Sequence, residues 1–323
     1  MLKPLVFASL CIASATLAGV AQAQAYPNKP IKLIVGFTPG GAADFTGRAV
    51  GDALSKVLGQ PVIIENKAGA GSSIAAEFVA KAPPDGYTIL IASPSSMSVN
   101  PAMSPTKSHS VNTLVPITRL SNSPLILTAN PSLGISSLKD LVVVAKKSPG
   151  KLNYSTSGPG SAPHLGAVYL KQATGIDIQH IPFKGGAPAV QAVVAGDVEL
   201  AFATPPSVLP FIKQGRLKGL AVSTPARSSF APDIPGMAES GYPSFNLNFW
   251  YGFFAPPGTP PEIINKLFEA TTAALQKQEL AAILGREATE VALSKSPAEF
   301  GQFLKDDAKL WEKLVKDSGA TAE

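Results

Sequence analysis

The chain has 323 residues, of which 45% are hydrophobic and only 15% charged, and its formal net charge is +5. A chain this long and this apolar can bury a large core, so intrinsic disorder is excluded, and the length favours two domains. Lys and Arg form no basic block with interleaved aromatic residues, so the composition gives no support for nucleic-acid binding.

The first 25 residues have the pattern of a secretory signal. Lys3 supplies the positive start, an apolar stretch covers residues 5–20, and small residues at 21–25 offer cleavage sites. Ser and Thr residues interrupt the stretch, so it falls short of the ~20 strongly apolar residues of a membrane span. The pattern predicts export to the periplasm with removal of residues 1–25. Cys11, the only cysteine, is removed with them, so the mature protein has neither disulfides nor thiol chemistry.

The remaining chain alternates between strand and helix patterns. In the first part we expect strands at 30–37, 61–65 and 87–92 and helices at 44–58 and 74–82. A second set follows, with strands at 125–129, 152–155, 178–183, 199–203 and 217–223 and helices at 137–145, 164–174, 187–195 and 208–214. Helices starting near Pro260 and Ser296 complete the chain.

This alternation predicts an α/β protein of two lobes, each a mostly parallel sheet flanked by helices. Strand-like crossings near Leu125 and Leu220 predict a two-segment hinge between the lobes. The predicted division places residues 26–124 and 222–323 in lobe 1 and residues 125–221 in lobe 2. Such a hinge permits the lobes to close over a ligand.

Two glycine-containing turns, at residues 38–44 and 155–161, each follow a strand pattern and lead into a helix pattern. Helix N-terminal amides can bind an anion, so two such turns in separate lobes predict a cleft that closes on a carboxylate. Asp44 is either a first-turn acid or a ligand contact. The hydroxyls of Thr156, Ser157 and Ser161 either bind the ligand or cap the helix.

Catalytic and metal-binding patterns are sparse. The three histidines, His109, His164 and His180, lack the i, i+3 or i, i+4 spacing of a helical metal pair, so we expect neither a metal nor a cofactor. Gly158-Pro159-Gly160-Ser161 has no glycine two residues after the serine, unlike a nucleophile elbow. An exported serine hydrolase using Ser161 and His164 remains an alternative, as does a receptor recruited to signalling.

Several motifs, in their order and spacing over essentially the whole mature chain, resemble one known family. They are Tyr26-Pro27-x-Lys29-Pro30-Ile31, Pro39-Gly40-Gly41-x-x-Asp44, Glu65-Asn66-Lys67-x-Gly69-Ala70-Gly71, Pro84-Asp85-Gly86-Tyr87, Pro149-Gly150-Lys151-Leu152-Asn153-Tyr154, His180-Ile181-Pro182-Phe183-Lys184-Gly185 and Trp250-x-Gly252 with Ala255-Pro256-Pro257-Gly258-Thr259-Pro260. The family is the Bug family of periplasmic receptors, the extracytoplasmic binding components of tripartite tricarboxylate transporters.

The resemblance implies a type II-like periplasmic binding fold, a small carboxylate ligand between the lobes and transient contact of a monomer with membrane transporter subunits. Carried onto matching positions, the ligand-binding residues would be Phe37, Thr38, Gly41, Ala42, Ala43, Asp44 and Ser93 from lobe 1 and Thr156, Ser157, Ser161, His164 and Thr204 from lobe 2. The chain departs from the family pattern at Ala68, Ser72 and Ala75, and Pro205-Pro206 follows Thr204.

Overall fold

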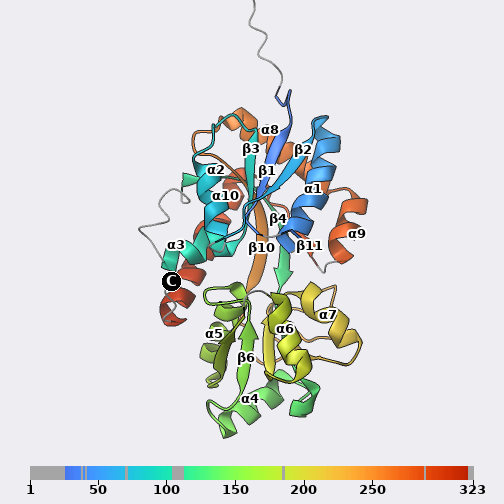
Figure 1. Ribbon diagram of the computed structural model, residues 1–323, viewed down its shortest axis with the longest axis vertical. Coiled ribbons are helices and arrows are strands. Elements are labelled where there is room, and N and C mark those ends of the chain that lie inside the picture. Colours follow the sequence, from blue (N-terminus) through green and yellow to red (C-terminus); the bar gives the residue numbers. More distant parts are fainter. Residues whose placement is uncertain are drawn as a thin grey trace, which may run out of the picture.

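The computed structural model describes residues 26–37, 39–40, 42–69, 72–103, 113–183, 186–286 and 289–318. Its elements form two halves stacked along the long axis of the molecule, each built around one sheet (Figure 1). The predicted signal at residues 1–25 lies outside the described residues.

The first half contains a mixed sheet, here sheet A, with the strand order β11-β4-β10-β3-β1-β2. Its strands are β1 (Ile31–Val35), β2 (Val62–Asn66), β3 (Thr88–Ala92), β4 (Val115–Pro124), β10 (Asn248–Ala255) and β11 (Glu290–Val291). Its helices are α1 (Ala42–Leu58), α2 (Ser73–Ala80), the π-helix η2 (Ser95–Val99), α3 (Asn100–Met103), α8 (Pro261–Leu275), α9 (Gln278–Arg286) and α10 (Pro297–Ser318).

The second half contains sheet B, with the order β7-β6-β8-β5-β9. Its strands are β5 (Ile126–Ala129), β6 (Asn153–Thr156), β7 (Gln179–Pro182), β8 (Leu200–Ala203) and β9 (Lys218–Val222). Its helices are the 3-10 turn η5 (Pro131–Leu133), α4 (Leu138–Lys147), α5 (Ala162–Thr174), α6 (Gly186–Ala195) and α7 (Pro205–Lys213).

The predicted α/β fold with two helix-flanked sheets is confirmed, but the prediction that each sheet is mostly parallel is wrong. β1, β2 and β3 pair in parallel, as do β6, β7 and β8. β10 runs antiparallel to β3 and β4, and β5 runs antiparallel to β8 and β9. Both sheets are therefore mixed. In sheet A, β4 leads the chain toward sheet B and β10 follows its return, so these two neighbouring strands run in opposite directions.

Both faces of sheet A are buried, which explains the near-continuous apolar runs in its strands. Alternate residues of β1 enter different cores: Leu33 packs in a cluster with Leu54 of α1, whereas Ile34 packs in a cluster with Val79 of α2. Sheet B follows the same rule. Leu127 shares a core with residues of α4 and α5, and Ile126 shares one with residues of α6 and α7.

Three chain segments meet where the two halves join, at Leu125, Ser223 and Leu247. The Ser223 hydroxyl accepts from the Leu125 N–H at 2.7 Å and donates to the Leu247 carbonyl at 2.5 Å. The backbones are also joined, since Ser223 N–H donates to Leu125 O and Leu247 N–H donates to Ser223 O, both at 2.8 Å. The fully buried Ser223 side chain thus ties all three segments together.

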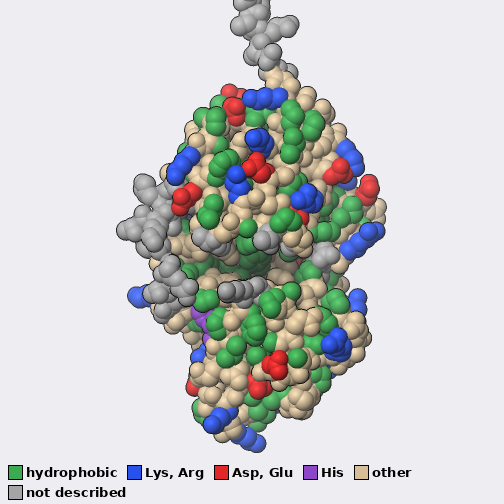
Figure 2. All heavy atoms as spheres, viewed as in Figure 1, with side chains coloured by type: hydrophobic (Ala, Val, Ile, Leu, Met, Phe, Trp, Pro, Cys, Tyr) green, Lys and Arg blue, Asp and Glu red, His purple; other side chains and the backbone are tan. Residues whose placement is uncertain are grey.

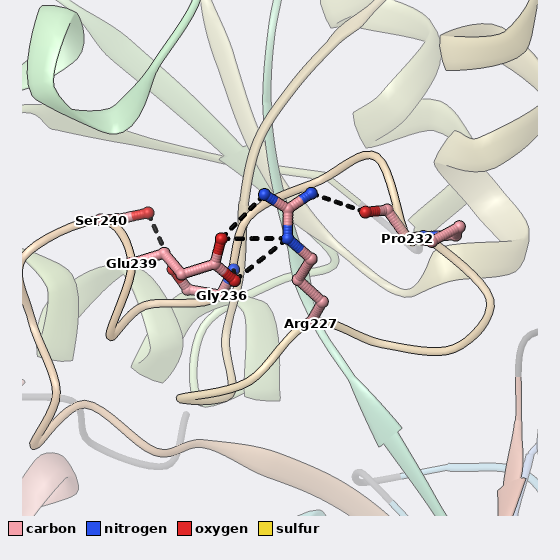
Figure 3. A network of polar contacts seen from close by, with 5 residues as sticks. All are labelled: Arg227, Pro232, Gly236, Glu239 and Ser240. Atoms are coloured by element: carbon pink, nitrogen blue, oxygen red, sulfur yellow. Dashed lines mark hydrogen bonds and ion pairs between the residues drawn. The ribbon is translucent and has the colours of Figure 1, made fainter.

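The segment between β9 and β10 is fastened to itself by Arg227. Its Nε donates to both Glu239 carboxylate oxygens, at 3.1 Å to Oε1 and 3.0 Å to Oε2, and its Nη2 donates to Oε2 at 2.8 Å. Its Nη1 donates to the Pro232 carbonyl at 2.6 Å (Figure 3). The same segment rests on sheet B, because Val222 bridges to Gly236 and Phe245 stacks on Tyr169 of α5. The return to sheet A therefore follows Leu247.

We expect Ser223→Ala to destabilise the fold, because it leaves the buried Leu125 N–H and Leu247 C=O without the hydroxyl. An unsatisfied buried group costs roughly 1–3 kcal/mol. Ser121→Ala is the matched control, since the Ser121 hydroxyl is equally buried but has no partner among the described residues. Urea unfolding should show a lower midpoint for Ser223→Ala only; equal midpoints for both variants would contradict this assignment.

Candidate functional site

The two predicted turns lie where the sheets face one another. Figure 1 shows β1 running from the N-terminal end toward the middle of the molecule and β6 running toward the middle from the opposite end. The turns after both strands, and the starts of α1 and α5, are therefore at the junction, where Figure 2 shows a hollow with hydrophobic side chains inside. The halves also touch there, because a Cβ on Gly160 would lie only 2.6 Å from the Met103 sulfur of α3.

The first turn is fastened from behind by Asp44. One carboxylate oxygen, Oδ2, accepts from the Gly40 N–H at 3.0 Å and from Arg48 Nε at 2.9 Å. The other, Oδ1, accepts from Asn66 Nδ2 at 2.9 Å, and that amide also donates to the Phe37 carbonyl at 3.0 Å. Asp44 is only 4% exposed, so its side chain fixes the turn between β1 and α1.

Ionisation of Asp44 is the condition for this arrangement. Burial opposes the charge, but the hydrogen bonds from Arg48, Gly40 and Asn66 outweigh burial and lower the pKa of the carboxyl to about 2. The Asp44 carboxylate is therefore charged at neutral pH and already engaged by three protein donors. These contacts are those of an acid in the first turn of α1, which is one of the two roles that the sequence allowed for Asp44.

Several hydrogen-bond donors near this turn have no partner among the described residues. The N–H groups of Ala42 and Ala43, at the start of α1, find no partner among the described residues. The hydroxyl of Ser93, directly after β3, is buried and likewise has no described partner. Thr38 and Gly41, which the sequence also predicts in this turn, lie outside the described residues.

Ser72 marks a third turn, after β2, that the predicted site did not include. Its hydroxyl is buried without a described partner, and its backbone has a positive φ of 76°. A Cβ on Gly36 would lie 1.8 Å from the Ser72 hydroxyl, so only glycine fits at position 36. The departure from the family pattern at Ser72 is the sequence signal that points to this position.

The second turn, after β6, uses most of its own backbone donors. Gly158 N–H donates to Thr156 Oγ1 at 3.2 Å, Ser161 N–H to Gly158 O at 3.3 Å and Gly160 N–H to His164 Nδ1 at 3.1 Å. The N–H groups of Ser157 and Ala162 find no partner among the described residues. This narrows the prediction of free helix amides to two donors on this side.

Ser161 has the geometry of a helix N-cap. Its hydroxyl donates to Gly158 O at 2.7 Å and accepts from the His164 backbone N–H at 3.4 Å. The His164 ring is directed by another contact, since its Nδ1 accepts from Gly160 N–H. These contacts give the hydrolase alternative no support.

Thr204 also acts locally. Its hydroxyl lies 2.7 Å from the Ser207 hydroxyl at the start of α7. Pro205 and Pro206 occupy the first two helical positions and have no N–H to offer, so this helix start supplies fewer backbone donors than α1 or α5.

The structure therefore brings most of the predicted residues to one junction but gives them different tasks. The sequence analysis did not predict that Arg48 and Asn66 bind Asp44 or that His180 contacts Thr156. Asn66 lies in the Glu65-Asn66-Lys67 motif at the end of β2, and His180 lies in another of the quoted motifs, but neither spacing reveals a contact across strands.

Within the described ranges, no group of three or more His, Cys, Asp or Glu side chains could hold a metal ion. None of the described helices has the length and apolarity needed to cross a membrane.

Residues 46–320 match the family model described as the tripartite tricarboxylate transporter family receptor. The chain belongs to this family. It is 36% identical to Protein BugT of Bordetella pertussis over 323 residues, which cover 99% of this chain and 98% of BugT. The predicted Bug-family resemblance is confirmed, and the chain is a solute-binding receptor.

Solved members of the receptor family share the fold. The structure titled R. palustris Rpa4515 with adipate is 31% identical, with a TM-score of 0.82 over 92% of this chain and 99% of that one. MatC from Rhodopseudomonas palustris with bound malate is 29% identical, with a TM-score of 0.78 over 90% and 100%. The periplasmic binding protein BugD is 30% identical, with a TM-score of 0.79 over 92% and 100%.

We expect Asp44→Asn to lower the stability of the receptor at neutral pH. The folded pKa of Asp44 lies below the ordinary value of about 3.9, so the charged carboxylate stabilises the fold above about pH 4 and this contribution is lost as pH falls toward 2. Asp52→Asn on the exposed side of α1 is the control. Urea unfolding across this pH range should show a deficit for Asp44→Asn that shrinks in acid; a deficit independent of pH would contradict the assignment.

Proposed function

We propose that this receptor binds a small carboxylate between the two sheets and presents it to membrane subunits of a tripartite tricarboxylate-type transporter. The observation that carries the proposal is the pair of helix starts at the junction, α1 and α5, where the N–H groups of Ala42, Ala43, Ser157 and Ala162 find no partner among the described residues. We infer that it binds its ligand without turnover.

The available interactions are strong enough for a transport receptor. Each helix N-terminus contributes ~0.3–2 kcal/mol toward an anion, and each hydrogen bond to a charged group ~1.5–3 kcal/mol. Four backbone donors and the Ser93 hydroxyl therefore reach the ~8 kcal/mol of a micromolar complex after the costs of association. Ordered waters extend the same donors to carboxylates of different length.

The ligand class is supported by the relatives. Adipate and malate, named in the titles of two solved family members, are both dicarboxylates and are the natural first probes for this chain. The hydrophobic side chains inside the hollow suit the methylene groups between two carboxylates (Figure 2).

Lobe closure is part of the proposal. Lobe 1 comprises residues 26–124 and 222–323, and lobe 2 comprises residues 125–221. The meeting of chain segments at Leu125, Ser223 and Leu247 supports a hinge at this place, because a few residues there can absorb a rotation of one sheet against the other. The segment between Ser223 and Leu247 rests on sheet B, so it would move with lobe 2. Closure brings the turn after β6 toward the turn after β1.

The cellular setting follows from the same proposal. Its solved relatives include periplasmic binding proteins, and residues 1–25 have the pattern of an export signal. We infer that the mature receptor is a periplasmic monomer that contacts its transporter subunits transiently.

A proline substitution at Ala162 tests one of the proposed backbone donors. Ala162→Pro removes one N–H at the first turn of α5, where proline is tolerated. The resulting Pro-Pro start already occurs in this chain at the start of α7, after Thr204 in a similar backbone conformation. We expect calorimetry to show at least a tenfold loss of affinity for adipate or malate, the value of a bond to a charged group.

Ala162→Gly is the matched control because it keeps the N–H, and its affinity should stay within about threefold of the parent. Thermal unfolding of both variants checks that the fold is kept. Equal affinity of Ala162→Pro and Ala162→Gly would remove this amide from the site.

A further inference from the structure

Three aromatic rings form a stack directly behind the turn after β6. The His180 ring of β7 stacks on the His164 ring of α5, with centroids 4.2 Å apart and planes at 16°. On its other side it stacks on the Tyr154 ring of β6, at 5.1 Å and 21°. The stack joins α5 to two strands of sheet B, β6 and β7, and two of its three rings are imidazoles.

Both imidazoles hold the turn by a ring nitrogen. His180 Nε2 lies 2.6 Å from Thr156 Oγ1, which also accepts from Gly158 N–H. His164 Nδ1 accepts from Gly160 N–H at 3.1 Å. The turn is thus anchored at Thr156 and Gly160. The amides of Ser157 and Ala162, which find no partner among the described residues, lie one and two residues after these anchors.

The hydrogen bonds define the protonation state of the pair. A nitrogen that accepts from an N–H cannot carry a proton, so His164 is neutral with its proton on Nε2. Burial and then Lys171 lower the pKa of His164; burial, His164 and Lys171 lower the pKa of His180 to about 4.

Among the described residues, the electrostatic partners of the stack include no acidic group that would supply a counter-charge. Tyr154 stays neutral, because burial raises its pKa to about 12. Lys171 of α5 lies 3.3 Å from Asp177 and also donates to the Ile178 carbonyl at 3.1 Å. A second proton on either ring would therefore meet a buried site, a neighbouring imidazole and a lysine.

We propose that His164 and His180 are positioning residues of the anion site, which fix the turn after β6 as neutral hydrogen-bond partners and do not act as cationic ligands of the carboxylate. This proposal rests on the proposed function and deepens it. It also assigns a role to His180, which lies outside the predicted site, and a different role to His164, which lies within it.

The two roles predict opposite pH dependence. A histidine with an ordinary pKa of about 6.5 becomes cationic as pH falls through that value and would strengthen binding of an anion. Neutral positioning residues give an affinity that stays level from about pH 8 to pH 6, a range in which adipate also keeps its charge. Calorimetry with adipate over this range distinguishes the two.

Paired amide substitutions test the ring nitrogens one at a time. The Asn amide oxygen takes the place of Nδ1, and the Gln amide oxygen takes that of Nε2. We expect His164→Asn and His180→Gln to bind adipate within about twofold of the parent, and His164→Gln and His180→Asn to bind five- to tenfold more weakly, the value of one lost hydrogen bond. Equal loss within each pair would overturn the proposal, as would a severalfold gain in affinity at pH 6.

A measurement without ligand separates this proposal from the proposed function. Nitrogen-15 spectra of the imidazoles, assigned through the three single histidine variants, should show His164 protonated only at Nε2 and both stacked rings with a pKa below the ordinary value of about 6.5. Hydrogen exchange of the Gly160 amide should be slow in the parent and in His164→Asn and fast in His164→Gln. If adipate and malate fail to bind the parent, the carboxylate assignment is lost while these spectra still decide the role of the histidines.

Discussion

Side chains behind each turn hold the backbone at the junction of the two sheets, and the site depends on this constraint. In sheet A, Asp44 fastens the turn through Gly40 and Asn66. In sheet B, His164 and His180 hold Gly160 and Thr156. The N–H groups at the helix starts that find no partner among the described residues are the ones that we propose as donors to the ligand.

The proposed site of backbone donors is compatible with ligands as different as the adipate and malate named for two solved relatives. Amide N–H groups and helix termini recognise negative charge without matching the shape of the rest of the ligand. In the proposed function, the side chains in the walls of the hollow then select the ligand. Receptors with the same backbone site can thus differ in the solutes they collect.

Local pattern was sufficient to predict much of this fold. The alternation of strand and helix, the start of α5 and the glycine-rich turns all follow from residues close together in the sequence. Strands β4 and β10 were missed, and the direction of β5 was not foreseen. An apolar run such as that around Trp250 does not reveal which neighbour it pairs with or in which direction. Pairing across distant segments is set by the whole chain.

The sequence predicted both turns at the junction but not the contacts of their side chains. It predicted Asp44, Ser161 and His164 as ligand contacts, and only the structure shows their hydrogen bonds to Gly40, Gly158 and Gly160. Hydrogen bonds of this kind depend on backbone geometry within a few residues, which motif spacing does not specify. The predicted list of ligand contacts stays a prediction.

A crystal structure of the receptor with adipate would show which groups of the two turns bind the ligand. We expect one carboxylate within hydrogen-bonding distance of N–H groups at the starts of both α1 and α5, with Asp44 still accepting from Gly40 and His164 still accepting from Gly160. A ligand that contacts only one sheet, or a carboxylate paired with a protonated His164, would contradict the proposed site.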